Sequence, residues 1–160
     1  VVAIGASPAS GWLADSALTL ADGVVCDSNC CAAEGIYAAG DVARWDHATT
    51  ATSMRLENRT NATEQAAAVA EAIVGAGRPY LPIPYFWSDQ YGTKIQVHGI
   101  ITADADGEIV DGDFQERRFV ARYVRDGVVT AILGWNMPKQ TRLYRPEIGT
   151  RIKSEGVKIA

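Results

Sequence analysis

Residues 36–43 read IYAAGDVA, a short apolar stretch that ends at a glycine followed at once by an acid. The apolar residues are typical of a short strand, and Gly40 allows the backbone to approach another group closely. A carboxylate at Asp41 can accept charge-assisted hydrogen bonds from hydroxyl groups, including those of a sugar-like ligand. A glycine-acid pair after a strand is also typical of an ordinary turn, so the residues alone leave both interpretations open.

Short strands and helical turns are predicted on either side of this stretch. Residues 1–5 read VVAIG and predict a buried strand, and residues 12–20 are compatible with one or two helical turns. Val24-Val25 follows an Asp-Gly turn signal and predicts another short strand. Residues 44–54 show little periodicity and predict a loop.

A helix is predicted after that loop. Its apolar residues recur at helical spacing and form one stripe of mostly small side chains: Ala62, Ala66, Val69, Ala70 and Ile73. Gly75 and Gly77 predict its end. Repeated prolines across residues 78–86 then favour extended chain and a domain boundary.

The second half changes to a strand pattern. β-Branched residues dominate 94–102, and residues 119–124 alternate between two faces. Asp106-Gly107 and Asp126-Gly127 are hairpin signals, the second leading into a partner strand over 128–135. Pro138 suits the first turn of a last helix that runs to about Tyr144. An antiparallel sheet with a terminal helix is therefore expected.

The composition, with 48% hydrophobic and 21% charged residues, is typical of a soluble globular protein. No apolar window is long enough for a transmembrane helix. The net charge is -4, and we expect no nucleic-acid partner. The C-terminal part is locally basic, which suits an acidic partner or an ordinary solvated surface: Lys139, Arg142, Arg145, Arg151, Lys153 and Lys158.

The three cysteines, Cys26, Cys30 and Cys31, do not form the even, spaced set of a secreted disulfide framework. A structural zinc or iron–sulfur site usually needs four ligands, and only His47 and His98 could supplement these thiols. We therefore expect free thiols in a reducing cytoplasm, no metal and no catalytic side chain among them.

The stretch at 36–43 closely resembles the second flavin motif of the FAD-dependent pyridine nucleotide-disulphide oxidoreductases. The resemblance implies that Asp41, after Gly40, binds the ribityl chain of FAD, and that the backbone of Val42 lies near the flavin pyrimidine edge. Residues 2–8 are similar to the family strand that returns from the NAD domain to the FAD domain.

Downstream residues match the same family in spacing: Arg55, Leu56, Glu57, Asn61, Ala62, Gln65 and Ala66. Arg59 stands where the family usually has a tryptophan. By resemblance Glu57 helps to place the nicotinamide, although an acid near a helix N-terminus is equally explained by the helix dipole.

Residues 84–92 read PYFWSDQYG, and without context such an aromatic run is typical of a core. The run resembles the ferredoxin reductase subgroup, of the putidaredoxin, rubredoxin and biphenyl dioxygenase reductase type. In that subgroup the tryptophan matching Trp87 lies by the flavin, where the iron–sulfur partner docks. Trp87, and with it Gln90, is therefore expected to contact FAD.

The resemblance implies an α+β chain: the C-terminal part of an FAD-binding α/β domain over 1–80, then a small reductase C-terminal domain over 81–160. It implies a flavoprotein that passes electrons from NAD(P)H through FAD to a ferredoxin or rubredoxin. No Gly-x-Gly-x-x-Gly turn occurs, so the sequence carries flavin-end contacts without a phosphate cradle. We therefore expect a fragment that is inactive alone and does not hold FAD tightly.

Other interpretations stay open beside this one. The chain could be a ferredoxin-docking or dimerisation module without catalysis, and a dimer is compatible with the sequence. It could also be a flavoprotein closer to apoptosis-inducing factor or to the flavin subunits of nitrite reductases.

Overall fold

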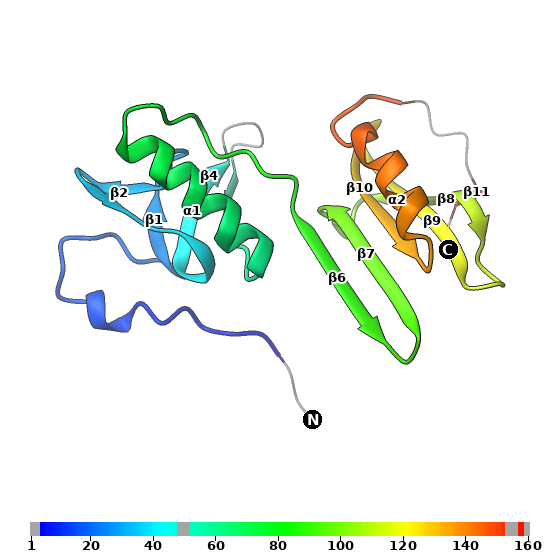
Figure 1. The fold of residues 1–160 in the computed structure, drawn as a ribbon, viewed down its shortest axis with the longest axis horizontal. Helices are drawn as coiled ribbons and strands as arrows, with labels where there is room; N and C mark the ends of the chain where they lie inside the picture. The colour runs from blue at the N-terminus through cyan, green and yellow to red at the C-terminus, as the bar shows by residue number, and fades with distance from the viewer. Residues whose placement is uncertain (1–3, 48–51, 153–156, 159–160) are drawn as a thin grey trace. The chain divides into compact units, whose positions relative to one another are not determined.

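The computed structural model describes residues 4–47, 52–152 and 157–158 (Figure 1). The chain divides into two compact units, Val1–Pro82 and Ile83–Ala160. Each unit has its own sheet and its own hydrophobic core. The α+β fold class expected from the sequence is confirmed. No helix within the described ranges is long and apolar enough to cross a membrane.

The first unit is built on a three-stranded sheet in the order β1-β4-β5. Strand β1 (Val24–Cys26) runs parallel to β4 (Ala43–His47), and β5 (Thr52–Met54) pairs antiparallel with β4. Between β1 and β4 the chain forms a small hairpin of β2 (Cys31–Ala33) and β3 (Ile36–Tyr37).

The loop expected over 44–54 is wrong, because β4 and β5 occupy most of that range. The burial of β4 alternates, with Ala43 and Trp45 completely buried and Asp46 exposed. The alternation of buried and exposed residues along β4 is not evident in the sequence, because most of its residues are polar. The parallel pairing with β1 stabilises a strand that local preference does not favour.

Helix α1 (Arg59–Ile73) confirms the predicted helix, but only part of the predicted apolar stripe is buried, since Ala62 and Val69 are half-buried while its other members are exposed. The two buried residues of α1 are polar, Asn61 and Gln65, while Ile73 is 63% exposed. Asn58 caps the helix by accepting a hydrogen bond from the backbone N–H of Asn61 at 2.8 Å. A stripe made mostly of alanine offers little apolar area, so a polar network decides the buried face instead.

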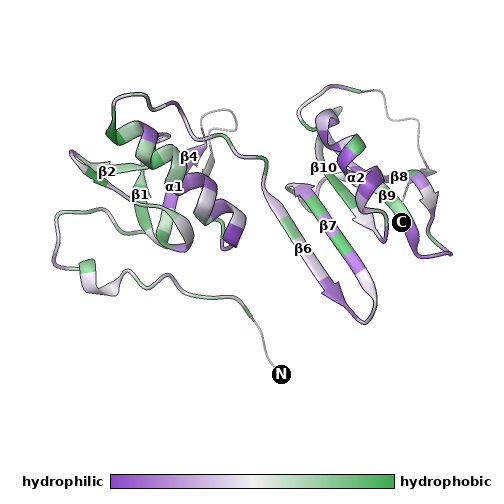
Figure 2. Ribbon diagram, in the orientation of Figure 1, coloured by the Kyte–Doolittle hydropathy of each residue, from purple (hydrophilic) through white to green (hydrophobic). Residues whose placement is uncertain are grey.

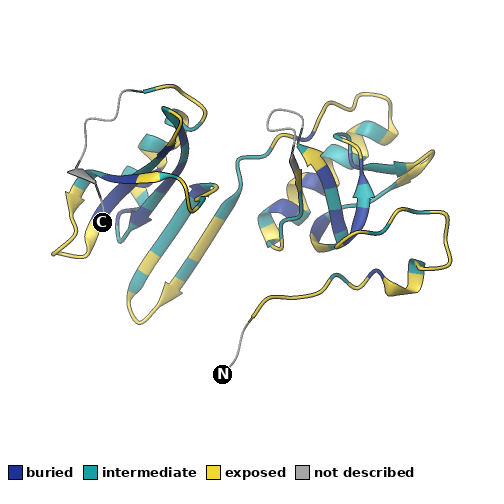
Figure 3. Ribbon diagram, turned by 180° about the vertical axis from the view of Figure 1, so that it is seen from behind, coloured by how far each residue is buried: buried dark blue, intermediate teal, exposed yellow. Residues whose placement is uncertain are grey.

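The strand predicted over 1–5 falls mostly outside the described residues, and of the helical turns predicted over 12–20 the structure has one short 3₁₀ helix, η1 (Gly11–Leu13). Val1–Ala3 lie outside the described residues, and Ile4 is 92% exposed without being in a strand. Figure 3 shows this segment as mainly exposed.

The second unit is a six-stranded sheet of antiparallel pairs in the order β11-β8-β9-β10-β7-β6. Its strands are β6 (Tyr85–Gln90), β7 (Thr93–Gly99), β8 (Asp106–Asp113), β9 (Arg118–Arg125), β10 (Val128–Trp135) and β11 (Val157–Lys158). The Asp126-Gly127 hairpin is confirmed, since both turn residues have positive φ. The turn expected at Asp106-Gly107 is wrong, because both residues lie within β8, paired with β9.

Helix α2 (Pro138–Tyr144) lies on one face of this sheet and continues into the 3₁₀ helix η3 (Arg145–Glu147). Its limits match the predicted terminal helix. The core beneath it is aliphatic, with Met137 added at the start of the helix: Val120, Val124, Val129, Ile132 and Met137. In Figure 2 hydrophobic residues mark β10 in this unit and β1 in the other.

Candidate flavin-site turn and its supports

The glycine-acid pair forms a single tight turn, the 3₁₀ helix η2 (Gly40–Val42), between β3 and β4. Gly40 is buried and has a φ of 76°, which a side chain would strain. A Cβ added at Gly40 would lie 3.3 Å from the Cβ of Ala62, in the first turns of α1. Glycine therefore allows η2 to lie directly against the beginning of α1.

A buried polar network ties this turn to α1. The backbone N–H of Gly40 donates to Oε1 of Gln65 at 2.9 Å, and Gln65 is completely buried. Nε2 of Gln65 donates to Sγ of Cys30 at 3.3 Å, and Nδ2 of Asn61 donates to Oε1 of Gln65 at 3.3 Å. The hydroxyl of Tyr80 donates to Oδ1 of Asn61 at 3.1 Å. Both amides are therefore held in fixed orientations by several partners.

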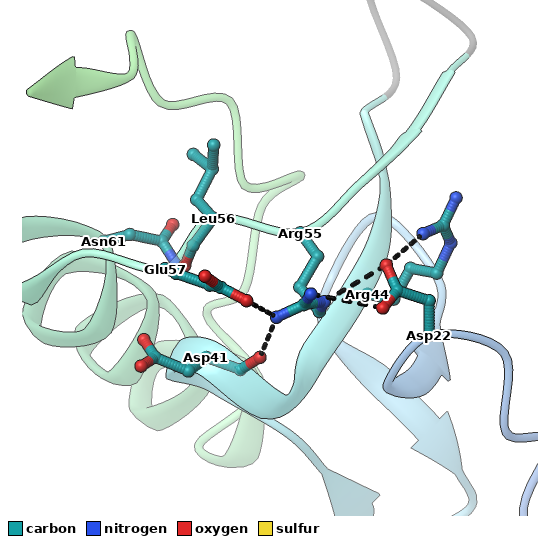
Figure 4. A network of polar contacts seen from close by, with 7 residues as sticks. All are labelled: Asp22, Asp41, Arg44, Arg55, Leu56, Glu57 and Asn61. Carbon is teal, nitrogen blue, oxygen red and sulfur yellow. Dashed lines mark hydrogen bonds and ion pairs between the residues drawn. The ribbon is translucent and has the colours of Figure 1, made fainter. Parts of the chain in front are cut away.

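The Asp41 side chain faces solvent and forms no hydrogen bond or ion pair with the described residues. Its backbone carbonyl, by contrast, accepts a hydrogen bond from Nη1 of Arg55 at 3.0 Å (Figure 4). The structure thus uses the backbone of Asp41 to hold the turn and leaves the carboxylate available to a ligand. An exposed carboxylate is a strong acceptor for hydroxyl groups.

Arg55 also contacts two other acids. Its Nε and Nη2 donate to the two carboxylate oxygens of Asp22 at 3.3 and 3.1 Å, and Nη1 also pairs with Glu57. Arg44 contacts the same Asp22 at 3.1 Å. Hydrogen bonds from Arg55 to Glu57 and then Asp22 raise the pKa of the guanidinium, which therefore stays charged.

The expected site residues fall into two groups. Gly40, Asp41, Val42 and Glu57 lie in the first unit, and Arg55 links Asp41 to Glu57. Trp87 and Gln90 lie on β6 in the second unit.

Trp87 is 45% exposed and its ring stacks on Tyr85, with centroids 5.6 Å apart. Tyr85 in turn stacks on the buried His98 at 4.6 Å, and its hydroxyl accepts a hydrogen bond from Gln96 at 2.8 Å. Gln90 is exposed, and among the described residues its side chain bonds only to the hydroxyl of the nearby Ser88, at 3.1 Å. The half-exposed indole is thus supported by the ring of Tyr85.

Sequence reasoning did not assign roles to the residues that support the turn, Asp22, Arg55 and Gln65. One available signal was the pair Asn61 and Gln65, two amides four residues apart on the same helical face. Uncharged polar residues at such spacing, next to a glycine turn, indicate a buried network rather than a solvated surface. Asp22 carried no such signal, because it lies far from Arg55 in the sequence.

The cysteines are free thiols. Burial raises the pKa of Cys26 to about 12, and burial also raises the pKa of Cys30. Among the described residues no group of His, Cys, Asp and Glu side chains is arranged to hold a metal ion. Cys30 contributes instead as an acceptor for Gln65.

The turn suits a flavin dinucleotide in its chemistry. The free Asp41 carboxylate matches the hydroxyls of a ribityl chain, and the missing Cβ at Gly40 allows close packing of the backbone. The half-exposed ring of Trp87 offers an apolar, stackable surface of the kind that aromatic cofactors use.

Comparison with known proteins gives two matches to protein families. Residues 1–66 match the family described as pyridine nucleotide-disulphide oxidoreductase, and residues 85–160 match the one described as reductase C-terminal. The 5,5'-dehydrodivanillate O-demethylase ferredoxin reductase subunit of Sphingobium sp. (strain NBRC 103272 / SYK-6) is 34% identical over 134 residues, or 82% of this chain and 32% of that protein.

Solved structures agree with these sequence matches. The ferredoxin reductase for the CYP199A2 system from Rhodopseudomonas palustris has a TM-score of 0.84 at 30% identity, over 93% of this chain and 38% of that one. The covalent putidaredoxin reductase–putidaredoxin complex has a TM-score of 0.81 at 26% identity, over 92% of this chain and 35% of that one. The chain therefore spans about a third of the length of the relatives it matches.

Proposed function

Because the chain belongs to the pyridine nucleotide-disulphide oxidoreductases, in their ferredoxin reductase subgroup, we propose that it forms part of a flavoprotein that passes electrons from NAD(P)H through FAD to a ferredoxin or rubredoxin. The observation that carries the proposal is the turn at Gly40–Val42, which leaves the Asp41 carboxylate exposed and free among the described residues. The named relatives favour this function over one nearer to apoptosis-inducing factor or nitrite reductase flavin subunits.

In this proposal the first unit is the C-terminal part of the FAD-binding domain and the second is the reductase C-terminal domain. Bound FAD would supply the step from hydride transfer to single-electron transfer. Asp41 would bind the ribityl hydroxyls, and the backbone of Val42 would lie near the pyrimidine edge. Glu57 would help to place the nicotinamide, and Trp87 and Gln90 would contact the flavin. We place this function in the cytoplasm, where the three free thiols would stay reduced.

The experiment is an NMR titration of the ¹⁵N-labelled chain with FAD. We expect weak binding, with the largest shifts at the amides of Gly40–Ala43, since phosphate-binding glycine turns are missing from the sequence. Asp41→Ala should weaken binding, and Asp46→Ala, at another exposed acid of the same unit, should not. Titration to millimolar FAD without shifts at the turn would contradict a flavin role for it.

A second candidate, a docking module for an acidic iron–sulfur protein, has one supporting observation. Lys139, Arg142 and Arg145 are all exposed on α2 and η3, beside Leu143, which is 77% exposed. Charge steering of this kind weakens as salt rises.

Binding of a ferredoxin to the chain should therefore fall with salt. Arg142→Glu should weaken binding more than Arg118→Glu, which reverses an exposed charge on β9. An equal loss of affinity in the two variants, or an affinity that does not change with salt concentration, would argue against docking at α2.

A further inference from the structure

Arg55 joins three segments that are distant in the sequence. Its guanidinium bonds to Asp22 before β1, to the carbonyl of Asp41 in η2, and to Glu57 before α1 (Figure 4). The side chain of Arg55 is only 11% exposed, whereas those of Asp22 and Glu57 are 56% and 34% exposed, so the guanidinium is shielded while its acidic partners stay partly in water. Several bonds that share one shielded guanidinium form a network, and such a network contributes more than an isolated ion pair on an open surface.

One nitrogen of Arg55, Nη1, bonds to both Asp41 and Glu57, the two residues expected to contact a ligand. Nη1 donates to the carbonyl oxygen of Asp41 and pairs with the carboxylate of Glu57, while Nε and Nη2 hold both oxygens of Asp22. A guanidinium is rigid and planar, so the two-point contact with Asp22 fixes the direction of Nη1.

The turn before β1 lies in close contact with η2 and with the side chain of Arg55. A Cβ added to Gly23 would lie 2.6 Å from the carbonyl oxygen of Val42 and 3.1 Å from Cδ of Arg55. The turn that carries Asp22 is therefore held against η2 by close backbone contact as well as by the ion pair between Asp22 and Arg55.

This arrangement explains why the Asp41 carboxylate is free. Arg55 already has two carboxylates, those of Asp22 and Glu57, and turns only toward the backbone of Asp41. A more mobile cation at this place could instead pair with the Asp41 side chain and occupy it.

We propose that Arg55 is a positioning residue that holds the Asp41 turn and Glu57 as one unit, with Asp22 as its brace, and so keeps the Asp41 carboxylate directed to the ligand. The part of this proposal that concerns FAD rests on the proposed function. The part that concerns the turn does not.

The first experiment measures amide hydrogen exchange by NMR in the 160-residue chain without ligand. The probes are the amides of Gly40 and Ala43, which donate to Gln65 and to the carbonyl of Gly40. Arg55→Met should speed their exchange by about tenfold or more, as expected for losing a hydrogen bond to a charged group. The matched control is Arg44→Met, which removes the other partner of Asp22 without touching the turn and should change exchange by less than about twofold.

Two further variants keep the proposal testable if Arg55→Met does not fold. Arg55→Lys keeps the charge and the stem but loses the planar fork, and Asp22→Asn weakens the brace from a distance. Both should speed exchange at Gly40 and Ala43. Unchanged exchange in these variants, or an equal effect of Arg44→Met, would overturn the positioning role.

The second experiment repeats the FAD titration with Arg55→Lys, for which we expect affinity to fall by about tenfold. Equal FAD affinity of wild type and Arg55→Lys would overturn the positioning role. If the wild-type chain shows no FAD binding while exchange responds as expected, the positioning role stands and the proposed flavin function fails.

Discussion

The backbone N–H of Gly40 and the side-chain oxygen of Gln65 form a hydrogen bond of 2.9 Å inside the first unit, although 25 residues separate them. Gln65→Leu leaves this buried N–H without its acceptor, and we expect a loss of about 1–3 kcal/mol in the free energy of unfolding. Urea denaturation measures the change. Glu64→Leu, at the exposed neighbouring position of α1, is the control and should stay within about 0.5 kcal/mol. An equal loss in both variants would contradict the role of this bond.

Gly134 is required by the packing of α2 on β10. A Cβ added there would lie 1.7 Å from Oγ1 and 2.8 Å from Cβ of Thr141, which is completely buried. Gly134→Ala should therefore destabilise the second unit by about 2 kcal/mol. Combining it with Thr141→Ala, which removes the nearest atom, should recover part of the loss in urea denaturation. Gly11→Ala, at a glycine with open space around it, is the control and should lower the free energy of unfolding only slightly. A Gly134→Ala protein as stable as the wild type would show that α2 can shift without loss of stability.

The three thiols should differ in reactivity. Cys26 and Cys30 are 2% and 0% exposed, and burial keeps their pKa values high, so at about pH 8 both remain protonated and shielded. Cys31 is partly exposed. We expect one fast equivalent with a thiol reagent in the folded chain and three in denaturant. Cys31→Ser should remove the fast equivalent; three fast equivalents in the folded chain would contradict the buried positions.

His98 should make the second unit sensitive to acid. Burial, and then the charge of Arg145, lowers the pKa of His98 below its ordinary 6.5 in the folded protein. The unfolded chain therefore binds more protons as pH falls through 6.5, and stability present above this pH is lost below it. Urea denaturation between about pH 7.5 and pH 5.5 should show this loss, and His98→Leu should reduce it. Parallel curves for the two proteins would exclude His98 as the cause.

Local patterns predicted the parts of the fold that local interactions decide. Pro138 marked the start of α2, and Asp126-Gly127 marked the turn between β9 and β10. Strand β4 was missed because its stability comes from pairing with β1, which no local window contains. The buried face of α1 was misjudged for a related reason, since Asn61 and Gln65 are buried by partners outside the helix.

At the candidate site, sequence resemblance indicated the residues that would face a ligand but not those that hold them. Asp41 and Glu57 were expected in the site, and Arg55 was noted only for its spacing. Its link to Asp22 depends on the fold, because β4 pairs with both β1 and β5 and so brings the segments next to those two strands together. Such supports become visible only when distances in space are known.

The order of the second sheet also bears on how quickly it can form. Strands β8, β9 and β10 follow one another in sequence and pair as neighbours, so each pairing closes only a short loop. Strand β7 instead pairs with β10, so that Gly99 meets Ala131 across a longer loop that contains both β8 and β9. We therefore expect β8, β9 and β10 to form the folding nucleus of the second unit, and the hairpin that carries Trp87 to dock after it.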